Sequence, residues 1–113
     1  MTEQRRFPRL ACQTPVQYRH LRQPQASYTG ALTHDVSAGG LKLSTSEWLP
    51  VQDRLLIQLT LPGTVAPIRT IAQVVWARKR PHGDHYEIGA RFIGLTPEDL
   101  GAVAAYVERG SRV

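Results

Sequence analysis

The sequence predicts an all-β protein, a small six-stranded antiparallel barrel followed by one C-terminal helix. Apolar and polar residues alternate in short segments from about residue 14 onward, and turns rich in Gly and Pro separate these segments. A helical apolar stripe occurs only near the C-terminus. Strands joined in this way can close on themselves, which removes exposed sheet edges. A chain of 113 residues is long enough for one such domain with a single core.

Six segments have the alternation of strands. They are expected over residues 14–22, 26–34, 41–45, 54–61, 67–79 and 86–92. The first is closed by Pro24, which cannot continue a central ladder. The second is expected to present Asp35 at its end, where residues 37–40 turn the chain into the third. In the third, Leu41 and Leu43 share one face.

The last three strands alternate most clearly. One face of the fourth collects Leu55, Ile57, Leu59 and Leu61. One face of the fifth collects Ile68, Thr70, Ala72, Val74 and Trp76. One face of the last collects Tyr86, Ile88, Ala90 and Phe92. Turns are predicted at Pro62-Gly63 and over residues 81–84, because Pro and Gly interrupt both places.

A helix is predicted over residues 97–109. Thr96 is a suitable N-cap, and Pro97 suits the first helical position. The expected apolar stripe consists of Leu100, Val103, Ala104 and Val107. Because a helix this short is marginal on its own, we expect the stripe to pack against the barrel.

Residues 1–13 lack apolar periodicity and are expected to form a flexible N-terminal arm, which leaves 14–113 as the barrel domain. The arm carries Arg5, Arg6 and Arg9. Two guanidinium groups spaced four residues apart can each make paired hydrogen bonds to a phosphate or to the O6/N7 edge of a guanine. The arm therefore has the chemistry of a clamp for an anionic ligand.

The turn after the second predicted strand offers complementary chemistry. Asp35 can accept hydrogen bonds from guanine N–H groups, and Ser37 can donate or accept. Gly39 and Gly40 allow backbone amides to approach an anion closely. Together with the arginines, these residues point to a guanine nucleotide that bears phosphates.

Arg5-x-x-x-Arg9 followed by Asp35-x-Ser37-x-x-Gly40 resembles the two-part signature of PilZ domains, which are bacterial receptors for cyclic di-GMP. Either motif alone is more often a solvated tail or a turn, but their order and separation favour the family. The resemblance covers nearly the whole chain. It continues through Val74-Val75-Trp76, Ile88-Gly89-Ala90-Arg91-Phe92 and Leu95-Thr96-Pro97-Glu98-Asp99.

The resemblance implies a PilZ-type split barrel and a set of ligand contacts. Arg5 and Arg9 would clamp guanine edges and phosphates, and Arg6 between them would add a contact. The residues implied to line the pocket around one base are Asp35, Ser37 and Gly40. The implied function is a cyclic di-GMP receptor or adaptor that signals to an unidentified partner protein through ordering of the arm.

Two roles are equally consistent with the position of Trp76 in the sequence. It continues the face of Val74, so it could fill the barrel, or it could stack on a base or a guanidinium of the ligand site. A second basic cluster, residues 78–80, lies beside the last predicted turn. Both basic clusters could face the same anion if the fold brings them together.

The composition narrows the class of protein. Fourteen Lys and Arg against nine Asp and Glu give a net charge of +5, which favours an anionic ligand or surface. Cys12 is the only cysteine, so an internal disulfide is excluded. No apolar run reaches the roughly 18 residues that cross a bilayer, and no apolar signal region precedes Pro8. We therefore expect a cytoplasmic protein without membrane insertion.

Two other functions remain open. One is a PilZ-like adaptor that acts through protein contacts without nucleotide, and the other is a small basic barrel that binds RNA or DNA. Nucleic acid is disfavoured because the exposed aromatics of single-strand binders are missing. No enzyme motif is present, and no cofactor is expected. His82 and His85 alone lack the further ligands that a metal site needs.

Overall fold

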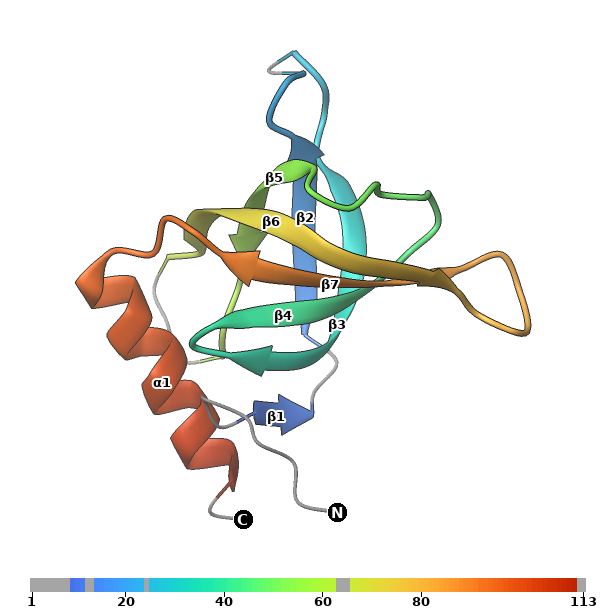
Figure 1. The fold of residues 1–113 in the computed structure, drawn as a ribbon. Helices are drawn as coiled ribbons and strands as arrows, with labels where there is room; N and C mark the ends of the chain where they lie inside the picture. Colours follow the sequence, from blue (N-terminus) through green and yellow to red (C-terminus); the bar gives the residue numbers. More distant parts are fainter. Residues whose placement is uncertain (1–8, 12–13, 24, 63–65, 112–113) are drawn as a thin grey trace.

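Six strands close into an antiparallel barrel, and a single helix follows at the C-terminus (Figure 1). The computed structural model describes residues 9–11, 14–23, 25–62 and 66–111. The elements are β1 (Arg9–Ala11), β2 (Pro15–His20), β3 (Thr29–Ser37), β4 (Gly40–Thr45), β5 (Arg54–Leu59), β6 (Ile68–Lys79), β7 (Tyr86–Phe92) and α1 (Pro97–Ser111). The barrel order is β3-β2-β5-β6-β7-β4, and β4 pairs back onto β3. The predicted fold class is confirmed.

The barrel is filled by side chains that alternate along its strands. On β5, Leu55, Ile57 and Leu59 are fully buried, and Leu61 just after the strand is buried with them, as predicted. They pack with a core contributed by the other strands and by α1. Each such side chain contributes about 1.5–3 kcal/mol when removed from water, so this face fixes the register of β5 between β2 and β6.

β3 begins and ends later than predicted, over Thr29–Ser37 instead of 26–34. Asp35 therefore lies within a strand and not in a turn. The cause is Val36, which is completely buried and keeps the backbone extended while its neighbours pair with β4. The turn shrinks to Ala38-Gly39, between the paired residues Ser37 and Gly40.

β1 pairs antiparallel with the end of β3, in the register Arg9↔Ser37, Leu10↔Val36 and Ala11↔Asp35. Residues 9–11 are thus a strand, although they belong to the segment 1–13 that was predicted to be an arm. The rest of that segment, residues 1–8 and 12–13, lies outside the described residues. Three residues are too few for alternation to reveal a strand. β1 forms because β2 pairs only with residues 29–32 of β3 and leaves this part of its edge open.

α1 packs against β1 and β3, at the lower left of the barrel in Figure 1. Its N-cap is as predicted, since the Asp99 amide donates to Thr96 Oγ1 at 3.1 Å. Its buried face differs in part from the prediction. Val103 and Val107 are buried, whereas Leu100 is 41% exposed and Ala104 is exposed.

Tyr106 takes part in the packing of α1 instead. Its hydroxyl lies 3.2 Å from Thr14 Oγ1, which ties the helix to the segment just before β2. The helix also runs through residue 111, two residues beyond the predicted end. Among the described residues, no helix is both long and apolar enough to span a membrane.

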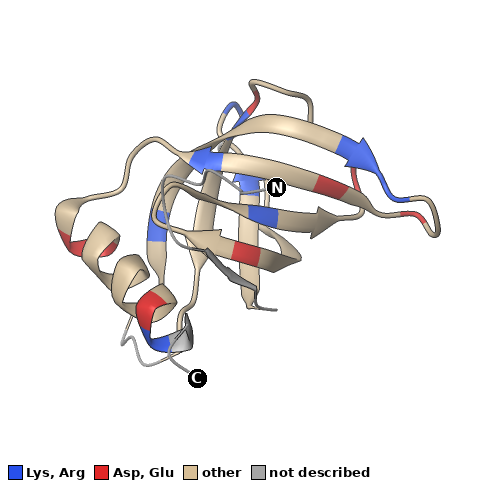
Figure 2. Cartoon of the chain, turned by 60° about the horizontal axis from the view of Figure 1, so that its bottom comes forward, with Lys and Arg blue, Asp and Glu red and all other residues tan. Residues whose placement is uncertain are grey.

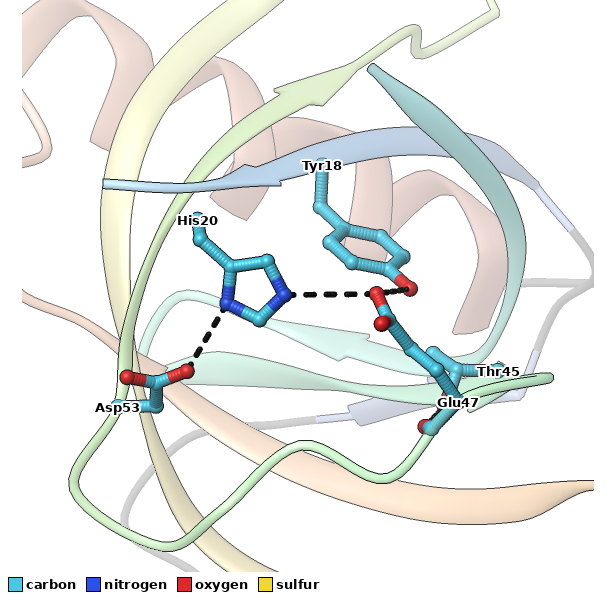
Figure 3. A network of polar contacts seen from close by, with 5 residues as sticks. All are labelled: Tyr18, His20, Thr45, Glu47 and Asp53. Atoms are coloured by element: carbon cyan, nitrogen blue, oxygen red, sulfur yellow. Dashed lines mark hydrogen bonds and ion pairs between the residues drawn. The ribbon is translucent and has the colours of Figure 1, made fainter. Parts of the chain in front are cut away.

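A polar network ties the loop between β4 and β5 to β2 (Figure 3). The Tyr18 hydroxyl donates to Glu47 Oε1 at 2.7 Å, and His20 lies between Glu47 and Asp53, with Nδ1 3.0 Å from Asp53 Oδ2. Burial, followed by the hydrogen bond to Glu47 and its charge, raises the pKa of Tyr18. Thr45 closes the network by donating to the Glu47 carbonyl. The loop is thereby held on the barrel.

Candidate ligand-binding surface

One outer face of the barrel gathers the residues that the sequence singled out. Strand register aligns Asp35 on β3 with Lys42 on β4, then Gly89 on β7, then Trp76 on β6. Residues paired in this way project to the same side of a sheet. That side is the outer one, because the alternate residues, such as Leu41 and the other core side chains, are buried. We call this face the candidate ligand surface.

Trp76 lies on the outside of the barrel because β6 contains an irregularity between Val74 and Trp76. An extra residue in one strand reverses the side on which the following side chains project. The prediction that Trp76 continues the inward face of Val74 is therefore wrong, and core filling is excluded. The indole is 37% exposed and lies so close to Gly89 that a Cβ there would overlap the ring.

The turn between β3 and β4 is ordered by Ser37. Its Oγ accepts from the amides of Gly39 and Gly40, at 3.2 and 3.3 Å, and donates to the Gly40 carbonyl at 3.4 Å. Gly40 itself is required by β7, because a Cβ at this position would lie 2.1 Å from the carbonyl oxygen of Ala90. The conformation of this turn thus follows from contacts within the protein.

A cluster of opposite charges lies beside Trp76, centred on Glu87. Arg78 donates to its carboxylate through Nε at 3.0 Å and lies within 2.9 Å through an Nη atom. Arg80 lies at 3.3 Å, and Lys42 bridges Glu87 at 3.6 Å and Asp35 at 3.5 Å. Figure 2 shows basic and acidic residues alternating across these neighbouring strands. The surface therefore carries partly exposed cationic groups around a nearly buried anion.

The pKa of Glu87 is set by two opposing effects. Burial raises it, but the hydrogen bond and charge of Arg78, with the charges of Lys42 and Arg80, outweigh burial and hold the pKa below its usual value. A carboxyl whose pKa is lower in the folded state stabilises the fold above its unfolded pKa. That contribution is lost as the pH falls through the folded-state pKa.

We expect Glu87→Gln to lower the free energy of unfolding at neutral pH by about 1–3 kcal/mol, since a charged hydrogen-bond acceptor is removed. The variant should also lose less stability than the wild type on acidification below the usual range of glutamate. Urea unfolding at neutral and acidic pH measures both effects. Asp84→Asn, in the exposed turn between β6 and β7, controls for the loss of one negative charge. Parallel pH profiles for Glu87→Gln and the wild type would contradict the assignment.

The sequence-predicted site residues fall into two groups. Asp35, Ser37, Gly40 and Trp76 lie on the candidate ligand surface. The backbone of Arg9 lies beside this surface, opposite Ser37. Arg5 and Arg6 are outside the described residues. Arg78 and Arg80, from the second basic cluster, reach the same face through Glu87, which supports the idea that both clusters border one site.

Lys42 and Glu87 also belong to this surface, although the sequence did not single them out. Alternation places both side chains on the outside of their strands, but it does not show that the two strands are neighbours, and only neighbouring strands bring the two charges together. Arg78 also lies with its guanidinium carbon 5.5 Å from the centre of the Trp76 ring, in a cation–π contact. Among the described residues, no group of His, Cys, Asp and Glu side chains could hold a metal ion. The chemistry available is recognition of an anion next to an aromatic surface.

Comparison with known families identifies the chain. The model of the PilZ domain matches residues 3–109. The chain belongs to the PilZ family. A comparison with curated proteins finds no match.

Solved PilZ structures have the same fold. The inhibitor of motility MotI from Bacillus subtilis superposes with a TM-score of 0.81 at 20% identity, over 98% of this chain and 53% of that one. The PilZ domain of YcgR from Escherichia coli, solved with c-di-GMP, gives 0.70 at 20% identity over 97% and 95%. MrkH from K. pneumonia, in a c-di-GMP complex, gives 0.75 at 17% identity over 96% and 52%. The chain thus spans about half of MotI and MrkH and nearly all of the YcgR domain.

Proposed function

We propose that this PilZ domain is a receptor for cyclic di-GMP. The observation that carries the proposal is that Asp35, Ser37 and Gly40, from one half of the family signature, lie with Trp76 on a single outer face. The solved PilZ domain of YcgR and the MrkH complex contain c-di-GMP, which supports the same ligand here. The role is binding and not catalysis.

The proposed contacts follow from the chemistry of the surface. Asp35 accepts from the N–H edge of one guanine, while the exposed part of the Trp76 indole is available for stacking. Arg5, Arg6 and Arg9 supply guanidinium groups for phosphates and the guanine O6/N7 edge. The pairing of Arg9 with Ser37 supports this, because it brings the end of the arginine motif beside the turn.

The same arrangement supports a role as an adaptor. Residues 1–8, which precede β1, form a ligand-clamping arm that orders over the barrel when the nucleotide is bound, and the changed surface is recognised by a partner protein. Repulsion among Arg5, Arg6 and Arg9 favours an open arm without ligand, and phosphate relieves it. Hydrogen exchange of the arm amides with and without cyclic di-GMP tests this step. Equal protection in both states would contradict it.

Isothermal titration calorimetry with cyclic di-GMP tests the binding itself and reports its stoichiometry. We expect saturable binding, and a loss of at least about tenfold in affinity for Asp35→Ala, because a charged acceptor for guanine is removed. Asp84→Ala, in the exposed β6–β7 turn, is the matched control and should bind as the wild type does. GMP is the control ligand. Absence of binding, or equal affinity for both nucleotides, would overturn the proposal.

A further inference from the structure

A second outer face lies around the barrel from the candidate ligand surface, on β2, β5 and β6. Its first row is Gln17, Gln58 and Arg69, joined by hydrogen bonds of 3.2 and 3.1 Å. Its second row is Arg19, Leu56 and Ile71. Its third row contains Arg54 and Gln73, beside Leu21. The alternate residues of these strands are buried in the barrel, so all three rows face outward.

As far as the structure describes the chain, this face is basic and carries no acidic side chain. It carries Arg19, Arg22, Arg54 and Arg69. The described acidic residues all lie elsewhere: Asp35 and Glu87 on the candidate ligand surface, Glu47 and Asp53 on His20, Asp84 in the β6–β7 turn, and Glu98, Asp99 and Glu108 on α1. Within the described part of the chain, these four arginines make no ion pair with a carboxylate. We call this surface the basic face.

A groove opens at one end of the basic face. It is lined by Leu21, Arg22, Gln52, Arg54 and Gln73 and has a volume of about 370 Å³. Arg22 and Arg54 are exposed, and the groove walls include the amide groups of two glutamines. Guanidinium groups only donate hydrogen bonds. The groove is therefore chemically suited to carboxylate oxygens.

Arg19 provides a separate indication that an acceptor is missing. Its guanidinium carbon lies 5.7 Å from the centre of the Tyr28 ring, and its Nη1 atom is buried without a hydrogen-bond partner among the described residues. A buried donor without a partner costs about 1–3 kcal/mol. Because Nη1 is buried, an acceptor from a partner would remove this cost only after the Arg19 side chain turned outward.

The middle of the basic face is apolar. Leu56 and Ile71 are half-buried between the two polar rows, and Ile93, whose amide donates to the Ile71 carbonyl, is 37% exposed. The polar rows at Gln58 and Arg54 are four residues apart on β5, which corresponds to about 13 Å. A single phosphate cannot reach both rows. A phosphate backbone would also leave the apolar row uncovered.

We propose that the basic face docks an extended acidic segment of a partner protein, in which acidic and apolar side chains alternate along the one side that meets this face. Carboxylates pair with Arg22 and Arg54 in the groove and with Arg69 at the opposite row, and apolar side chains cover Leu56 and Ile71. Long-range attraction to the basic face speeds association, as is usual for complementary charge. The inference does not depend on nucleotide binding.

The test uses the full chain and a labelled synthetic peptide. Every second residue of the peptide is Glu or Leu in turn, and Ser stands between them, so that Glu and Leu share one side of the extended peptide. Fluorescence anisotropy should show saturable binding that weakens by at least about tenfold in Arg54→Glu/Arg69→Glu. Arg109→Glu, on the exposed side of α1, is the control for a charge reversal away from the basic face and should retain binding. The control peptide has Gln in place of Glu and should bind at least about tenfold more weakly.

The outcomes separate this proposal from others. Equal affinity of the wild type and the double variant for the Glu peptide would overturn it, provided that urea unfolding shows both to be folded. Preference for an RNA or DNA duplex over the peptide would also overturn it. So would self-association of the chain that the double variant abolishes, since the occupant would then be a second copy. Unchanged affinity for cyclic di-GMP in the double variant shows that the two surfaces act separately.

Discussion

Replacing Arg5 and Arg9 together with alanine is expected to abolish binding of cyclic di-GMP at micromolar ligand concentrations. One bidentate contact between arginine and guanine contributes about 1–3 kcal/mol, so the loss of two such contacts should weaken binding by at least about tenfold, and by about a thousandfold or more if both contacts are strong. We expect little change in the free energy of unfolding without ligand, because the role implied for both arginines is contact with the ligand and not packing of the barrel. Calorimetry and urea unfolding measure the two quantities.

Lysine variants at Arg5 and Arg9 distinguish paired hydrogen bonding from simple charge attraction. Lysine keeps the positive charge but cannot make the paired hydrogen bonds of a guanidinium. If the arginines recognise guanine edges and phosphates through such pairs, the lysine double variant should bind far more weakly than the wild type. An affinity close to that of the wild type would mean that charge alone attracts the ligand. Arg109→Ala on α1 is the control for loss of a distant arginine.

The largest effect on stability is expected for Gly40→Ala. The added Cβ would lie 2.1 Å from Ala90 O and 2.9 Å from Arg91 Cα, and both are backbone atoms of a paired strand that cannot move aside alone. Overpacking of this kind typically costs about 1–3 kcal/mol and sometimes more. We expect the variant to unfold at markedly lower urea concentration in the absence of any ligand.

Gly30→Ala is the matched control for that experiment. It also places a methyl group on a strand of the barrel, but nothing lies within 4 Å of the new Cβ. Its stability should therefore stay within about 1 kcal/mol of the wild type. If Gly40→Ala were as stable as Gly30→Ala and only ligand affinity fell, Gly40 would serve the ligand and not the barrel.

Most of the barrel can be predicted from the sequence, because the core side chains occur at every second residue along each strand. Leu55, Ile57 and Leu59 could be assigned to the interior from alternation alone, and all three are buried. Alternation fails where the backbone departs from a regular ladder. The irregularity between Val74 and Trp76 turns the Trp76 side chain to the outside of the barrel, and the residue types around it do not predict this irregularity.

The candidate ligand surface was predictable only in part, for a different reason. Asp35, Ser37 and Gly40 form a local motif, which one sequence can display. The contacts of Lys42 with Asp35 and Glu87 join three strands, and they exist only in one sheet order and register. Local patterns do not determine which strands become neighbours around a barrel. β1 escaped prediction similarly, since a three-residue strand is defined by the open edge of β3 that receives it.

β1 contacts two parts of the molecule that are otherwise distant in sequence. It pairs with the end of β3 beside the Ser37–Gly40 turn, and it also packs against α1 (Figure 1). A displacement of Arg9–Ala11 cannot remain local, because it changes the environment of the turn and of the helix together. A movement of β1 would therefore be transmitted to α1. A spectroscopic label on the exposed side of α1 would report a change in the position of the N-terminal segment.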